Sequence, residues 1–184
     1  LMERRFEAYK TKVVTPFFRD HFQRVDRQIV LVDALSAINA GHAAVADLER
    51  ALTEILTCFR PGTNNPFSAL IQRRIDRILI AATKADHLHH ESHARLEAII
   101  ERIVANAAKK ASLSGASVNT VALAAVRATR EATVNEKGET LPVVVGTPIA
   151  GETIGAETFD GNRETAIFPG DLPADPSALF EPVD

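Results

Sequence analysis

The sequence predicts an α/β fold in which a mostly parallel sheet has helices on both faces. Three apolar runs of strand length, residues 28–33, 78–82 and 120–126, alternate with two long stretches of helical periodicity. This order of strands and helices is typical of parallel strands joined by right-handed crossovers. Because the runs are apolar throughout, they suit strands that are covered on both faces.

The composition excludes several classes of protein. With 184 residues, 46% hydrophobic and 24% charged, the chain has the composition of a soluble globular domain. The formal charge of −3 argues against a nucleic-acid partner. Cys58 is the single cysteine, which excludes an intrachain disulfide and fits a reducing compartment. No stretch approaches the roughly 18 apolar residues of a membrane span, so we expect a cytoplasmic protein without a transmembrane segment.

Helical periodicity marks the beginning of the chain and its two central stretches. Residues 2–13 indicate the end of an amphipathic helix, and Thr15 followed by Pro16 predicts the N-cap of a short helix over residues 17–24. An edge strand is the competing interpretation of that segment. A longer helix follows Gly41, and a third runs from beyond Asp86 to about residue 111. The apolar residues expected to pack inward are Phe17, Phe18, Phe22, Val45, Leu48, Leu52, Ile55, Phe59, Leu96, Ile99, Ile100, Ile103 and Ala107.

The last third of the chain has a different character. Residues 131–134 and 143–145 flank a Lys137-Gly138 turn and predict a hairpin. Beyond Thr147, glycine and proline accumulate, so we expect extended or loosely ordered chain. The predicted organisation is therefore a helix end at residues 1–14, an α/β core at 15–130, and a hairpin with an extended tail at 131–184.

Polar residues follow all three apolar runs. They are Asp33, the segment Thr83-Lys84-Ala85-Asp86, and the segment Arg127-Ala128-Thr129. Because the carboxyl ends of parallel strands meet at one edge of a sheet, we expect these three groups to converge there. Ligands of open α/β sheets bind at that edge.

The residues themselves suggest which ligand this edge binds. The apolar stem of Lys84 can lie along a heterocycle, while the carboxylate of Asp86 can accept two N–H bonds from a ring edge, as in guanine recognition. Adenine lacks that donor pattern. Thr-Lys-Ala-Asp resembles the Asn/Thr-Lys-x-Asp signature of GTPases. Asp33 can hold a hydrated Mg²⁺ beside phosphates, as a Walker-B aspartate does, or it can cap the following turn.

Two further observations qualify this interpretation. No GxxxxGK[ST] motif occurs in the chain, so we expect the chain alone to bind nucleotide poorly. His89, His93 and Glu97 share a helical stripe with metal-like spacing, but the same stripe continues into the apolar core row. A metal-binding module is therefore a separate hypothesis.

Four segments occur in an order typical of one family: PFFRDHFQRVDRQIVLVDAL, AATKADH, AAVRATRE and FPGDLP. Together they resemble the YcjX-like family of bacterial P-loop GTPase-like proteins, from about Arg5 to Pro173. The resemblance implies a partial P-loop NTPase of the Ras-like G-domain type, with the end of a helical insertion at residues 1–14. It also implies a role in envelope or heat-shock stress of Gram-negative bacteria, in the cytoplasm or peripheral to the inner membrane.

The resemblance also implies roles for particular residues. Asp33 is then the Walker-B acid, and Thr83, Lys84 and Asp86 recognise the base. The backbone N–H of Ala128, in the loop between Arg127 and Thr129, approaches the guanine O6. GTP or GDP with Mg²⁺ is the expected ligand of the full-length protein.

The chain departs from the family pattern in three ways. Family members carry a P-loop upstream of Leu1 and continue past Asp184, so we expect an interior fragment that is inactive without the missing P-loop region. Thr83 replaces the asparagine of the commonest signature. No water-positioning residue, catalytic residue or protein partner can be identified from the sequence. Two hypotheses therefore remain open: a slow GTPase, and a stress-associated scaffold that retains a nucleotide fold without turnover.

Overall fold

A computed structural model of the chain describes residues 2–20, 25–58, 75–136 and 138–181. The chain divides into two compact units. The first comprises Leu1–Val30, Leu48–Ile80 and Val104–Asn119, and the second comprises Leu31–Asp47, Ala81–Ile103 and Thr120–Asp184. All of the predicted site residues belong to the second unit.

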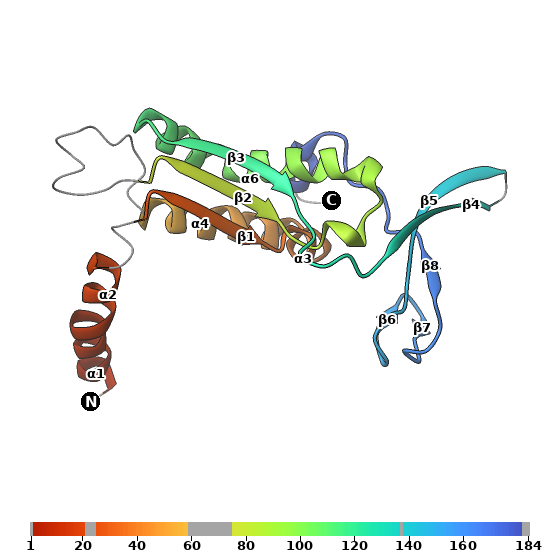
Figure 1. Cartoon of the computed structure of the whole chain (residues 1–184), viewed down its shortest axis with the longest axis horizontal. Coiled ribbons are helices and arrows are strands. Elements are labelled where there is room, and N and C mark those ends of the chain that lie inside the picture. The colour runs from red at the N-terminus through yellow and green to blue at the C-terminus, as the bar shows by residue number, and fades with distance from the viewer. Residues whose placement is uncertain (1, 21–24, 59–74, 137, 182–184) are drawn as a thin grey trace. The chain divides into compact units, whose positions relative to one another are not determined.

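Three strands form the predicted sheet: β1 (Arg27–Val32), β2 (Arg77–Ala82) and β3 (Ser117–Ala122). They are hydrogen-bonded in the order β1-β2-β3 (Figure 1). At their start, Asp76 N donates to Asp26 O and Ser117 N to Asp76 O; at their end, Thr83 N donates to Val32 O and Leu123 N to Ala82 O. Since the strand starts pair with starts and the ends with ends, the parallel arrangement is confirmed.

The helices that follow β1 and β2 are α3 (Ala34–Asn39), α4 (His42–Cys58) and α6 (His93–Leu113). Figure 1 shows α4 and α6 on the same face of the sheet, and Asn106 Nδ2 on α6 donates to Glu49 Oε1 on α4 over 3.4 Å. Ile29 on β1 is 65% exposed. Among the described residues, the prediction of helices on both faces is therefore wrong. Two right-handed crossovers that step the same way along a sheet place both helices on one face.

In α4 and α6 the apolar core follows the predicted rows with two differences. Leu48 is only half-buried. Ile55 on α4 is exposed and Leu56 is buried in its place. The buried residues of the first unit include Leu52, Leu56, Ile75, Ile78, Ile80, Val104 and Ala107; those of the second include Val32, Val45, Ala81, Ala82, Leu96, Ile99, Ile100 and Ile103. The predictions for Phe22 and Phe59, and for the side chain of Phe18, lie outside the described residues.

At the amino end, the helical segments are continuous. α1 (Met2–Tyr9) passes into a π-helical turn, η1 (Lys10–Val14), and then into α2 (Thr15–Asp20). The predicted N-cap at Thr15 is wrong, because Thr15 has helical dihedrals and both its N–H and its Oγ1 donate to Lys10 O. Pro16 lacks an N–H and its ring crowds the preceding turn, which the wider π-helical turn accommodates. Phe17 is exposed, so its predicted inward packing is also wrong.

Two elements of the core begin earlier or later than predicted. The third strand covers residues 117–122 instead of 120–126, and Val126 is exposed in the loop that follows it. Two 3₁₀ turns, η3 (Ala85–His87) and η4 (His90–Ser92), precede α6. The predicted third helix therefore begins at His93, several residues beyond Asp86.

The predicted hairpin is confirmed. β4 (Arg130–Glu136) and β5 (Glu139–Gly146) are antiparallel, with a register from Arg130↔Val145 to Glu136↔Glu139. Gly138 in the turn has a φ of +90°, which suits glycine. β8 (Thr165–Ile167) pairs with β5, so this part of the tail, predicted as extended or loosely ordered chain, is an extended strand of the hairpin sheet.

The remaining described elements of the tail are short. β6 (Thr153–Ile154) pairs with β7 (Glu157–Thr158), and η5 (Pro176–Phe180) follows. The guanidinium of Arg102 on α6 lies 4.4 Å from the ring centroid of Phe180, and Arg95 donates to Leu172 O over 3.0 Å. These contacts hold the tail against α6. None of the helices in the described ranges is long and apolar enough to cross a bilayer.

Candidate functional site

The three polar groups that follow the strands converge, as predicted. Asp33 comes directly after β1, and Thr83 to Asp86 come directly after β2. Residues 127–129 lie farther along, because residues 123–126 separate them from β3. Side-chain and backbone hydrogen bonds nevertheless connect the β1 group and the late loop to the β2 group.

Thr83 forms two hydrogen bonds that connect the end of β2 to the end of β1. Its N–H donates to Val32 O over 2.8 Å, and its Oγ1 donates to the same oxygen over 3.2 Å. The hydroxyl is therefore used within the sheet. Thr83 positions the loop that follows it.

Lys84 and Asp33 form the closest charged pair of this edge. Lys84 has left-handed dihedrals, φ 62° and ψ 30°, and is the one non-glycine residue with positive φ among those described. This reversal directs its side chain toward β1, where Nζ lies 2.6 Å from Asp33 Oδ2. Both side chains are partly exposed, at 49% for Lys84 and 38% for Asp33.

Asp33 also caps α3. Ser36 N donates to Asp33 Oδ1 over 3.2 Å, and Ser36 Oγ donates to Oδ2 over 2.8 Å. The capping alternative considered for Asp33 is therefore confirmed as its geometry in this structure. The hydrogen bond from Lys84 lowers the pKa of Asp33 below its ordinary value, with the bonds from Ser36 adding to the effect and partial burial opposing it.

Asp86 connects the loop after β2 to the loop after β3. Ala128 N donates to Asp86 Oδ2 over 3.2 Å, and Thr129 Oγ1 donates to the backbone oxygen of Asp86. Two bonds thus hold residues 128–129 against Asp86. The structure brings together all three strand ends that the sequence analysis selected.

Arg127 turns away from this edge. Its Nε donates to Thr129 O over 3.2 Å, and its guanidinium lies 3.1 Å from Glu131 Oε1. Arg127 therefore shapes the loop and faces β4.

A pocket of about 630 Å³ adjoins the loop. Its described lining includes Ala128 and Thr129, together with Leu88, Val144 and Phe168, but neither Lys84 nor Asp86. The charged groups of the candidate site therefore lie outside this largely apolar pocket.

The sequence profile of the YcjX-like family matches residues 1–184. The chain belongs to the YcjX-like family.

Two curated relatives show the extent of the similarity. The Ras-like GTPase YcjX of Escherichia coli (strain K12) is 36% identical over 174 residues, which cover 95% of this chain and 35% of the relative. The Ras-like GTPase YcjX of Shewanella oneidensis is 33% identical over 173 residues, which cover 94% of this chain and 33% of the relative. The YcjX-like chain thus spans about a third of the length of these relatives.

The predicted histidine stripe does not form in the YcjX-like chain. His89 precedes α6, His93 Nε2 lies 2.9 Å from Ala85 O, and Glu97 Oε1 accepts from Ala122 N over 2.9 Å. His93 and Glu97 thus have separate structural partners. The i,i+4 spacing was misleading because His89 has extended dihedrals between the two 3₁₀ turns and lies before the first turn of the helix.

Two residues near the site were missed. Ser36 donates hydrogen bonds to both carboxylate oxygens of Asp33. Glu131, at the beginning of β4, contacts both His90 and Arg127. Burial raises the pKa of Glu131, but the hydrogen bond from His90 and the charges of His90, Arg127 and His89 lower it, and the net shift is downward. An aspartate directly before a helical segment is a helix-start signal. Its side chain accepts from the N–H two or three residues further on, which could have identified Ser36.

Proposed function

We propose that this YcjX-like chain supplies the base-recognition side of a guanine-nucleotide site in a longer protein that binds GTP or GDP with Mg²⁺. The observation that carries the proposal is the 3.2 Å bond from Ala128 N to Asp86 Oδ2. It joins a carboxylate that can accept from a guanine ring edge to an N–H that can donate to a guanine oxygen. The names of the two relatives as Ras-like GTPases support the same ligand class.

Asp86 retains capacity for a ligand in this arrangement. An ionised carboxylate offers about four acceptor positions on its two oxygens, and the bond to Ala128 uses one of them. Two ring N–H groups can therefore bind to the positions of Asp86 that remain. Because a backbone N–H carries one proton, the N–H of Ala128 has to leave Asp86 Oδ2 before it can donate to a guanine oxygen. Hydrogen bonds to a charged group contribute roughly 1.5 to 3 kcal/mol each, which makes Asp86 the main source of base specificity.

The donor chemistry of Asp33 fits Mg²⁺, which prefers carboxylate oxygen and water. In this structure, however, Oδ2 of Asp33 already contacts Lys84 Nζ. For Lys84 to lie along a base and Asp33 to face a hydrated ion, this pair has to separate. Both side chains are partly exposed, so solvent limits the cost of separation.

The decisive experiment is Asp86→Asn in a full-length YcjX-like protein that carries this sequence. An asparagine amide donates where the carboxylate accepted, so affinity for GTP should fall about 100-fold or more and affinity for xanthosine triphosphate should rise. Fluorescence competition with labelled nucleotides measures both. Asp76→Asn, the same change at the opposite end of β2, is the matched control and should alter neither affinity. An Asp86→Asn variant that still prefers GTP would contradict the proposal.

One observation favours a second candidate, a nucleotide-binding scaffold without turnover. α3 begins at Ala34, directly after Asp33, and Ser36 is engaged in the cap. The segment that would place a water-positioning side chain next to the phosphates is thus already helical. Measuring phosphate release by the full-length protein separates the two candidates: release that depends on the P-loop supports the GTPase, and nucleotide binding without release supports the scaffold.

A further inference from the structure

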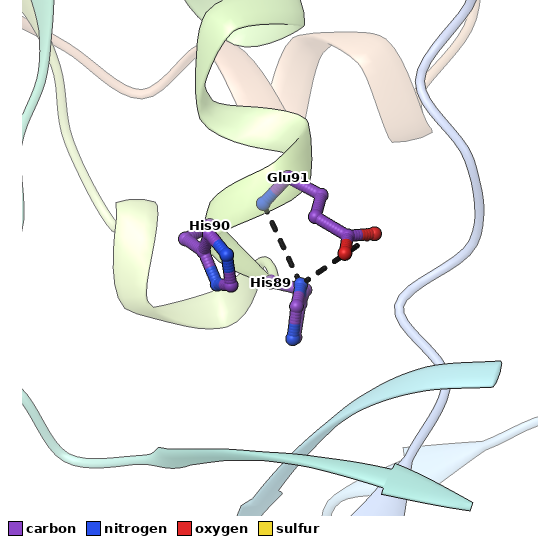
Figure 2. A group of neighbouring side chains, drawn as sticks. All are labelled: His89, His90 and Glu91. Carbon is purple, nitrogen blue, oxygen red and sulfur yellow. Dashed lines mark hydrogen bonds and ion pairs between the residues drawn. The ribbon is translucent and has the colours of Figure 1, made fainter. Parts of the chain in front are cut away.

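Three side chains of types that can bind a metal ion lie together at the 3₁₀ turn η4. His89, His90 and Glu91 each place one ligand atom within 4.8 Å of the others (Figure 2). The two imidazole rings are tilted toward each other, with centroids 4.3 Å apart. Glu131 on β4 lies beside them, with Oε2 2.6 Å from His90 Nδ1 and 4.0 Å from His89 Nε2.

His89 is the buried member of the cluster, with only 7% of its side chain exposed. A buried imidazole normally has close polar partners. The Nδ1 of His89 instead accepts a long, 3.5 Å bond from Glu91 N and faces Glu91 Oε2 at 4.0 Å, as Figure 2 shows. This nitrogen is held in place by burial without a strong hydrogen bond.

His90 is oriented by a carboxylate. Its Nδ1 is bonded to Glu131 Oε2, and an Nδ1–H that donates to a carboxylate leaves Nε2 as the ligand nitrogen of the ring. Metal-binding histidines commonly donate their other ring N–H to a carboxylate, which fixes the tautomer and the ring orientation. Glu131 is itself held by Arg127. This chain of contacts prepares one nitrogen of His90 for a cation.

We infer that His89, His90 and Glu91 bind a divalent transition-metal ion of the Zn²⁺ class, with Glu131 positioning His90. Two imidazoles and one carboxylate are a donor set that Zn²⁺ uses with water as the fourth ligand, whereas Mg²⁺ prefers oxygen ligands. The side chains of His90 and Glu91 are 63% and 67% exposed, so they can close on an ion around the fixed Nδ1 of His89. This site shares no residue with the proposed nucleotide site.

The test uses full-length protein without a polyhistidine tag, treated with EDTA and then desalted. Zn²⁺ is titrated by isothermal calorimetry, and Co²⁺ is added separately to record its visible absorption, which reports nitrogen and oxygen ligation. We expect one Zn²⁺ per chain. His90→Gln and Glu91→Gln should each weaken binding about tenfold or more, and Glu131→Gln should weaken it by about 10- to 100-fold, as the loss of an orienting carboxylate does.

Two controls keep the outcome independent of folding and of nucleotide. His42→Gln changes an exposed histidine at the start of α4 and should bind Zn²⁺ as the unchanged protein does. Asp76→Asn, the control of the nucleotide test, should also bind Zn²⁺ normally, because neither proposed site contains Asp76. The absence of stoichiometric Zn²⁺ binding, or binding that the combined His90→Gln and Glu91→Gln variant retains, would overturn the inference.

Discussion

Lys84 Nζ and Asp33 Oδ2 lie 2.6 Å apart although 51 positions separate the two residues in the sequence. The contact joins Lys84, which is expected to lie along a base, to Asp33, which is expected to bind a hydrated metal ion. Each charge therefore neutralises the other in this structure. The pair is also the main reason for the lowered pKa of Asp33.

Replacing the lysine should make this dependence measurable. We expect Lys84→Met to raise the pKa of Asp33 toward its ordinary value of 3.8. A lowered folded-state pKa contributes stability that is present above the ordinary pKa and lost as pH falls through the lowered value. The variant should therefore lose up to about 1 kcal/mol at neutral pH and little in acid, because both side chains are exposed to solvent screening.

The measurement is an NMR titration of the Asp33 carboxyl carbon together with urea unfolding at neutral and acid pH. Lys109→Met, which changes an exposed lysine on α6, is the control. An Asp33 titration that is the same in Lys84→Met and in the unchanged protein would contradict the assignment.

The loop after β3 depends on the hydroxyl of Thr129, which donates to the backbone of Asp86. Thr129→Val keeps the shape of the side chain and removes this donor, so we expect a loss of about 1 kcal/mol in the free energy of unfolding. Guanine-nucleotide affinity of the full-length protein should fall as well. Thr133→Val, at an exposed position of β4, is the matched change and should be nearly neutral; equal effects of the two changes would show that the hydroxyl has no special role.

The open face of β1 predicts an asymmetry between two isoleucines of the sheet. Ile29 is 65% exposed, whereas Ile80 on β2 is fully buried. Ile80→Ala should cost roughly 2 to 5 kcal/mol, as large-to-small changes in a core do, and Ile29→Ala should cost less than about 1 kcal/mol. Denaturant unfolding of both variants under the same conditions checks the difference. Similar losses would mean that the face of β1 is covered in solution.

The strongly patterned elements of the fold were predictable from sequence. The continuous apolar run of β2 and the periodic rows of α4 and α6 identify those elements because burial on a sheet face or along a helix stripe requires them. β3 was placed too late, since its true span includes Ser117 and Asn119. An edge strand tolerates polar residues on its open side, so its boundary is weakly marked by hydrophobicity.

The sequence predicts that the residues of the candidate site converge at one sheet edge. It does not predict which side chains contact each other there. Parallel connection brings Asp33, Lys84, Asp86 and Ala128 to one edge whatever the side chains do. That Lys84 faces Asp33 follows from its left-handed backbone, and that His90 faces Glu131 follows from 3₁₀ turns and a hairpin register. Neither feature has a periodic signature in the sequence.

The cap on α3 also gives this edge its own spectroscopic reporter. The amide proton of Ser36 points at Asp33 Oδ1, and its chemical shift depends on the charge of that carboxylate. Any cation or phosphate that changes the surroundings of the aspartate will move this one resonance in ¹⁵N-labelled protein, with no assumption about turnover. Binding of an ion near Asp33 thereby becomes observable as a change in the chemical shift of a single backbone amide.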